Sequence, residues 1–175
     1  IELQERGVTG MSFTDVLARS GAARGAIYHH FPDGKAQLVA EAAEAFGHQV
    51  RDQIAILPVA SPTAVVQAFV EAIRPVVAAS SRGAGCAVAA VAVGANVDQD
   101  RLRRAAASAF SSWTDQLAER LQLAGMDRRA ASNLAQMMIM ILEGAHVLCR
   151  ATGNTEPFEH AARSLTALMR NGRSR

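Results

Sequence analysis

The side chains best suited to chemistry stand together between residues 24 and 35, in the stretch RGAIYHHFPDGK. An arginine can donate two parallel hydrogen bonds to the edge of a guanine, and tyrosine, histidine and lysine can donate to phosphate oxygens. Gly25 and Ala26 leave room for close backbone approach, and the Ala26 methyl can meet the methyl group of thymine. These residue types predict contact with DNA.

Catalytic and metal-binding patterns are not found in the sequence. No nucleophilic side chain has a general base at the spacing of a recognisable catalytic motif, and no metal-binding or phosphate-binding motif occurs. Cys86 and Cys149 are too few and too far apart for a metal cage or a disulfide framework, so we expect two buried free thiols. We therefore expect no enzyme, no metal and no cofactor.

The elements that position these residues are two short helices joined by a glycine turn. Ser12 and Asp15 have the capping-box spacing that opens a helix, and Gly21 supplies the turn after it. We expect a second short helix over about residues 24–31 and a longer one over about 35–56. This order is typical of a helix-turn-helix, in which the second helix lies in the major groove.

The stretch over residues 10–38 resembles the DNA-binding region of TetR-family transcriptional regulators. That family carries a glycine turn, a recognition helix of small residues and a Leu/Ile-Tyr-x-His-Phe signature, here IYHHF over residues 27–31. A lysine and a leucine then open the next helix. The glycine before Lys35, the run GCAVAAVA over residues 85–92 and LEGA over 142–145 resemble its LmrA/YxaF-like branch.

The resemblance implies a repressor that binds a palindromic operator as a homodimer and is released by a small apolar or amphipathic effector. It implies DNA contacts from Thr14, Arg24, Gly25, Ala26, Tyr28, His29, His30 and Lys35. Arg24, near the start of the recognition helix, would reach a guanine. Lys35, at the positive end of its helix, would reach a phosphate.

The charge of the N-terminal region argues against strong phosphate binding. Residues 1–57 carry five basic side chains (Arg6, Arg19, Arg24, Lys35, Arg51) and seven acidic ones (Glu2, Glu5, Asp15, Asp33, Glu41, Glu44, Asp52). Phosphate neutralisation normally supplies much of DNA affinity. The sequence also opens as if partway through a helix, so we expect a missing N-terminal segment, whose basic residues could restore the balance.

Apolar residues recur at helical spacing along nearly the whole chain and no strand pattern occurs, so we expect an all-α protein. We assign residues 1–56 to a helix-turn-helix DNA-binding domain with a truncated first helix. Residues 57–175 are assigned to a helical ligand-binding and dimerisation domain. Helices expected over 127–152 and 155–170 have several apolar faces, and by resemblance they pair with their symmetry mates in a four-helix bundle.

Two sets of residues follow for this second domain. The candidate pocket lining is mostly aromatic, aliphatic or sulfur-containing: Phe69, Ile73, Cys86, Val88, Phe110, Trp113, Met137, Met140 and Glu143. Such side chains also make ordinary core, and Glu143 could simply pair with His146, one turn away, or with Arg150, two turns away. The candidate dimer interface is apolar: Met138, Ile141, Ala145, Leu148, Phe158, Ala161, Leu165 and Leu168.

Composition excludes little by itself, since half of the residues are apolar, 19% are charged and the net charge is +2. We find no run of about 18 uncharged apolar residues and no signal peptide, so we expect no membrane span and a cytoplasmic location. Two alternatives stay open. One is an architectural DNA-binding protein without an inducer, and the other is an all-helical enzyme that uses Cys86, Glu143 or His146.

Overall fold

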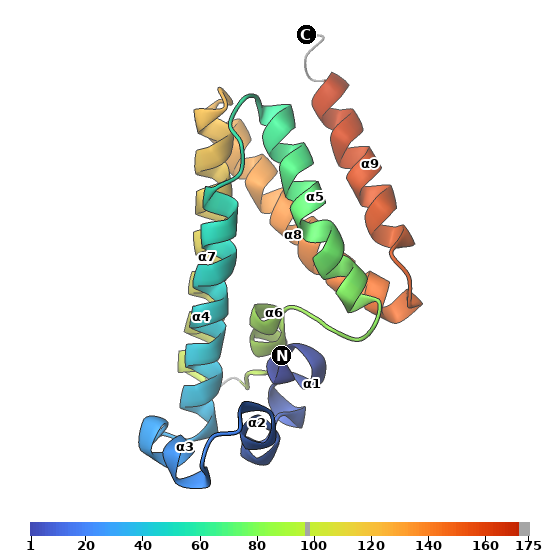
Figure 1. The fold of residues 1–175 in the computed structure, drawn as a ribbon. Coiled ribbons are helices and arrows are strands. Elements are labelled where there is room, and N and C mark those ends of the chain that lie inside the picture. The colour runs from blue at the N-terminus through green and yellow to red at the C-terminus, as the bar shows by residue number, and fades with distance from the viewer. Residues whose placement is uncertain (97–98, 172–175) are drawn as a thin grey trace. The chain divides into compact units, whose positions relative to one another are not determined.

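The structure is a computed structural model that describes residues 1–96 and 99–171, apart from the side chains of Arg24, Ala26 and Asn171. Within these residues every regular element is a helix (Figure 1), which confirms the all-α prediction. The helices are α1 (Glu2–Gly10), α2 (Phe13–Ser20), α3 (Arg24–His30), α4 (Lys35–Ala55), α5 (Pro62–Ser80), α6 (Ala87–Gly94), α7 (Asp100–Leu123), α8 (Arg128–Thr152) and α9 (Glu156–Asn171).

The chain divides by packing into two compact units. The first contains Ile1–His48 and Cys86–Phe110, and the second contains Gln49–Gly85 and Ser111–Arg175. The chain returns to the first unit after residue 85 because α6 packs against α1. The boundaries of these units do not coincide with the boundary at residue 56 that we expected between the DNA-binding and ligand-binding domains. That functional boundary stays a prediction.

In the first unit, α1 and α6 approach closely. A Cβ atom placed on Gly94 of α6 would lie 3.1 Å from the Cβ of Val8. The apolar sequence of α6 reflects this packing, since Val88 and Val91 are fully buried. Gly7 has a φ of 67° and interrupts α1, which then resumes as far as Gly10.

In the second unit, α5, α8 and α9 lie side by side (Figure 1). Their shared core contains Phe69 of α5, Met138 of α8, and Phe158 and Leu165 of α9, all at most 3% exposed. α5 continues through Pro75 to Ser80, so the proline does not end the helix.

Two of these helices, α5 and α8, are long and apolar enough to cross a membrane by length and composition alone. The search for uncharged apolar runs did not single out these helices because each contains charged residues, and the absence of a membrane span stays a prediction. Core helices of globular proteins pass the same test, and here α5 and α8 pack against each other. We attribute their apolar character to this packing.

A hydrogen-bonded polar pair is buried between α5 and α8 in the second unit. Ser80 Oγ of α5 lies 2.6 Å from His146 Nδ1 of α8 and donates to the Val76 carbonyl at 3.2 Å. A hydroxyl has one hydrogen, so when Ser80 donates to Val76 the imidazole is in its Nδ1–H tautomer and donates to Ser80. Burial lowers the pKa of His146 to about 4, which keeps the ring neutral near pH 7.

Both cysteines are buried, as expected: Cys86 stands at the N-cap of α6, where its sulfur accepts a hydrogen bond from the Ala89 N–H at 3.4 Å, and Cys149 lies inside α8.

Candidate nucleic-acid interface

The helix-turn-helix begins at a well-formed cap. Ser12 Oγ accepts a hydrogen bond from the Asp15 N–H at 3.1 Å and donates to the Asp15 carboxylate at 2.6 Å. The carboxylate thus binds the capping hydroxyl, whereas a full capping box would place it on the backbone. Gly21 ends α2 in the left-handed region, with a φ of 67°, which a glycine adopts without strain.

α3 is held on one face and open on the other. Ile27 is 5% exposed and anchors the helix. The Phe13 ring of α2 meets the Tyr28 ring edge-on, with centroids 5.6 Å apart, while Tyr28 stays 62% exposed. His29 and His30 are exposed and stack edge-on at 5.5 Å. Three of the predicted DNA contacts on α3 are therefore accessible to a partner.

Gly25 also lies on the exposed part of α3. A Cβ atom at this position would meet nothing within 4 Å, so packing within the chain does not require a glycine here. Glycine in a helix costs about 1 kcal/mol relative to alanine. The open space at Gly25 leaves room for a binding partner such as DNA to come close to the α3 backbone. The side chains of Arg24 and Ala26 lie outside the described part of the chain, so their predicted contacts stay predictions.

The remaining predicted contacts flank α3. Thr14 is exposed on α2. Lys35, at the start of α4, is half-buried, and its ammonium donates to the Thr9 carbonyl at 3.4 Å. An ammonium has three donors, so two of them remain for a phosphate.

Gln37 fixes the end of α3 against α4, a role that the sequence analysis missed. Its amide oxygen accepts from the Asp33 N–H at 3.0 Å, and its amide nitrogen donates to the His30 carbonyl at 3.3 Å. The same nitrogen donates to Glu41 at 2.9 Å. The signal was the spacing of four residues from Gln37 to Asp33 on one side and to Glu41 on the other.

Arg101 of α7 adds a second support for the loop after α3. Its guanidinium lies 3.3 Å from the Asp33 carboxylate and 3.9 Å from that of Glu41. All three groups are exposed, so each pair contributes little free energy. Arg101 lies 68 residues from Asp33, and no local sequence pattern could have linked them.

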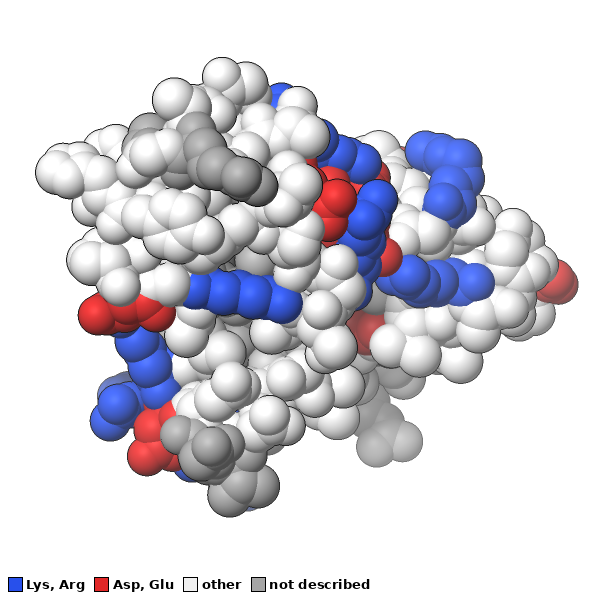
Figure 2. Space-filling model, turned by 90° about the horizontal axis from the view of Figure 1, so that it is seen from below, with Lys and Arg blue, Asp and Glu red and all other residues white. Residues whose placement is uncertain are grey.

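The acidic residues of α1 form ion pairs with arginines of the first unit. Glu2 is 2.6 Å from Arg19 and 3.4 Å from Arg6, and Glu5 is 2.9 Å from Arg19. The two pairs with Arg19 tie α1 to α2, and all three pairs occupy the arginines. Figure 2 shows basic and acidic side chains interspersed among uncharged residues, without one continuous basic patch. The face drawn there does not offset the shortage of positive charge seen in the sequence.

The predicted pocket residues are divided between the two units. Phe69, Ile73 and Trp113 are buried in the second, Cys86 and Val88 are buried in the first, and Phe110 is half-buried in the first. Glu143 is half-buried on α8, and His146 bonds to Ser80. Met137 and Met140 are 37% and 65% exposed, so they face outward from the single chain and do not line its interior.

The predicted interface residues also separate into two groups. Met138, Ala145, Phe158 and Leu165 are buried within the second unit itself, so a second chain cannot reach them. Leu148 and Leu168 are 54% and 59% exposed, and Ile141 and Ala161 are half-buried. The sequence analysis missed Val147, which is 66% exposed. Exposed apolar residues form a stripe along α8, which we call the α8 stripe: Met137, Met140, Val147 and Leu148.

Two family models match the chain. Residues 2–42 match the model of bacterial regulatory proteins of the tetR family. Residues 62–164 match the C-terminal domain of LmrA/YxaF-like transcriptional regulators. Together these matches cover the helix-turn-helix and most of the second unit.

Curated relatives align over nearly the full chain. The HTH-type transcriptional regulator Rv0196 of Mycobacterium tuberculosis is 34% identical over 172 residues, which cover 95% of this chain and 88% of the relative. The HTH-type transcriptional regulator LmrA of Bacillus subtilis is 26% identical over 169 residues, which cover 95% and 90%. A solved TetR transcriptional regulator from Legionella pneumophila shares the fold with a TM-score of 0.78 at 22% identity, over 95% of this chain and 90% of that one.

Proposed function

Because the chain belongs to the TetR family of transcriptional regulators, we propose that it is a ligand-responsive repressor that binds a palindromic operator as a dimer. Regulators of this family bind DNA, act as dimers and are not enzymes. The observation that carries the proposal is the capped helix-turn-helix with an exposed, glycine-containing α3. A repressor acting on operator DNA works in the cytoplasm, which is the location we propose.

The proposed DNA contacts divide by role. Arg24, Gly25 and Ala26 stand in the first turn of α3, where a recognition helix meets base edges. Thr14, Tyr28, His29, His30 and Lys35 are the proposed contacts to the DNA backbone, because their donors suit phosphate oxygens. Their exposure on α2, α3 and the start of α4 supports this assignment, with Lys35 half-buried.

The α8 stripe is the proposed centre of the dimer interface, together with Leu168 of α9. A single chain leaves these apolar side chains in water, and covering them is favourable. A twofold dimer matches a palindrome whose half-sites lie about one DNA turn apart.

A small, largely apolar effector bound in the second unit is the proposed inducer. The buried apolar side chains of Phe69, Ile73 and Trp113 support an apolar binding region there. α4 begins in the first unit and ends in the second, so it can carry a change from one to the other. A coupling of about 1–3 kcal/mol, typical of linked sites, is enough for release.

Two substitutions test the DNA-binding assignments. Arg24→Ala is expected to lower discrimination between operator and random DNA by about 1–3 kcal/mol, because it removes a two-pronged base contact. Lys35→Ala is expected to weaken both DNAs alike and to lower the salt slope by about one unit. Fluorescence anisotropy across a salt series measures both quantities. Equal weakening of both DNAs by Arg24→Ala would reassign Arg24 to a phosphate, and an unchanged slope would remove Lys35 from the interface.

A further inference from the structure

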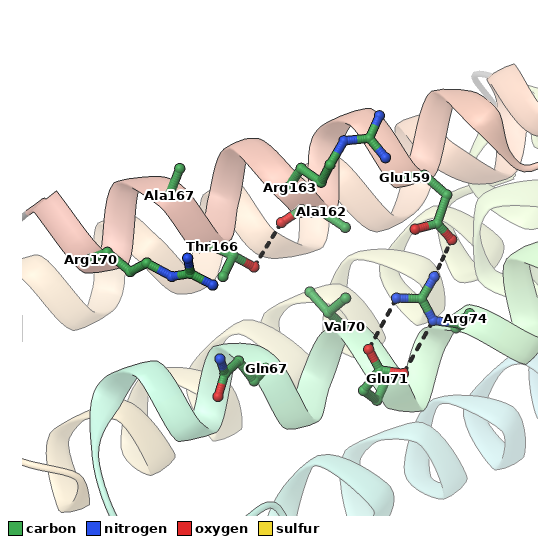
Figure 3. Close-up of a pocket in the computed structure, with 10 residues that line it drawn as sticks. All are labelled: Gln67, Val70, Glu71, Arg74, Glu159, Ala162, Arg163, Thr166, Ala167 and Arg170. Atoms are coloured by element: carbon green, nitrogen blue, oxygen red, sulfur yellow. Dashed lines mark hydrogen bonds and ion pairs between the residues drawn. The ribbon is translucent and has the colours of Figure 1, made fainter.

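A groove of about 820 Å³ runs between α5 and α9 in the second unit (Figure 3). Its α9 side extends from Glu159 to Arg170, which is roughly 16 Å of helix at 1.5 Å per residue. Its middle is apolar, with Val70 on α5 and Ala162 and Ala167 on α9. The volume lies within the usual range for small-molecule sites.

At one end of the groove, the charge of an arginine is offset by two carboxylates. The Arg74 guanidinium donates to Glu71 at 3.0 and 3.1 Å and also to Glu159. The same group lies 5.6 Å from the centre of the Phe158 ring. The two carboxylates raise the pKa of Arg74, so it stays charged, but with them it forms a cluster of net charge −1 that does not attract an anion.

The other arginines of the groove are not neutralised in this way. Among the residues that the structure describes, neither Arg163 nor Arg170 forms an ion pair. Figure 3 shows Arg170 reaching from α9 into the space between the helices, into which Gln67 points from α5. Three arginines against two glutamates give the lining a net charge of +1. The positive charge lies at the end away from Arg74.

We propose that this groove binds an amphipathic anion, with its acidic head group at Arg170 and Gln67 and its hydrocarbon chain along Val70 and Ala162. Arg163 lies on the flank of the groove and adds attraction at longer range. This inference gives the proposed effector an amphipathic, anionic class and places it between α5 and α9 of the second unit, instead of against Phe69, Ile73 and Trp113. To that extent it rests on the proposed function.

The groove is separate from the proposed dimer interface. At 100° per residue, Arg163, Arg170 and Ala167 share one side of α9, and Leu168 and Ala161 share the opposite side. A ligand in the groove and a second chain on the α8 stripe can therefore be bound together. The carbonyl end of α9 carries partial negative charge, so the side chain of Arg170 has to supply the attraction.

The test is calorimetric titration of the DNA-free protein with dodecanoate, below the concentration at which it forms micelles. We expect one dodecanoate per chain and at least tenfold weaker binding by Arg170→Gln. Dodecanol, with the same chain and no charge, should bind the wild type at least tenfold more weakly than dodecanoate. Arg128→Gln is the matched control, because it removes the same charge from an exposed position at the start of α8.

Three results would overturn the groove as a site for anions. They are no binding of dodecanoate, equal losses in Arg170→Gln and Arg128→Gln, or equal affinities for dodecanoate and dodecanol. A separate DNA-binding titration with added dodecanoate tests the ligand response. Binding in the groove with no change in DNA affinity would contradict the ligand response and leave the groove assignment intact.

Discussion

Replacing Leu165 with glutamate is expected to unfold the chain, whereas replacing Val147 with glutamate is expected to separate two folded chains. Leu165 is 2% exposed inside the second unit, so the new carboxylate would be buried without a partner. An uncompensated buried charge costs about 3–5 kcal/mol, a large part of the stability of an ordinary domain. Val147 is 66% exposed, so its carboxylate stays in water until a second chain covers it.

Urea unfolding followed by circular dichroism measures the first effect, and sedimentation velocity at micromolar concentration measures the second. Val147→Thr is the control, since it has nearly the same shape without the charge and should stay dimeric. A Leu165→Glu chain as stable as the wild type would contradict the packing of α9. A Val147→Glu chain that sediments as a dimer would place the interface elsewhere than the α8 stripe.

Acidification is expected to destabilise the wild type through His146. The pKa of this imidazole is about 4 in the folded chain and near 6.5 when unfolded, because burial disfavours its charged form. Between these values the unfolded chain binds more protons, so stability falls as the pH falls from 6.5 to 4. The difference corresponds to about 3 kcal/mol, and this penalty is absent above pH 7.

The measurement is the free energy of unfolding at fixed protein concentration from pH 7.5 to pH 4, for the wild type and for His146→Gln. Glutamine does not titrate and can still donate to Ser80, so the variant should lose about 3 kcal/mol less over this range. His160→Gln changes an exposed imidazole and serves as the control. Parallel curves for the wild type and His146→Gln would show that His146 does not titrate with a lowered pKa.

The helix-turn-helix could be predicted because its signals are local. Ser12 and Asp15 lie three residues apart, and Gly21 ends the helix that they begin, so neighbouring residues specify the cap and the turn. The second helix of the pair also carries a signature of the family, the sequence IYHHF. Contacts between residues far apart in the sequence could not be predicted. Ser80 and His146 are separated by 66 residues, and Arg101 and Asp33 by 68.

The faces of α8 could not be assigned from sequence for a physical reason. The helix is apolar on several sides, so its periodicity does not separate the side packed by its own chain from the side left outside. Met138 is fully buried and Met140 is 65% exposed, although both are methionines two residues apart. The sequence analysis placed Met138 in the interface and Met140 in the pocket. Only the packing of α5 and α9 decides between these roles.

The central claim is that α3 reads DNA sequence while the dimer sets the spacing of the half-sites. Selecting tight binders from a pool of random duplexes, with the wild type and with Gly25→Gln, tests it most directly. Position 25 has open space, so the variant should fold normally. We expect the wild type to select an inverted repeat with half-site centres about one helical turn apart, or a multiple of that. The variant should keep the spacing and either change the half-site sequence or fail to converge. The same half-site selected with equal affinity by both proteins, or wild-type sequences without a repeat, would contradict the account.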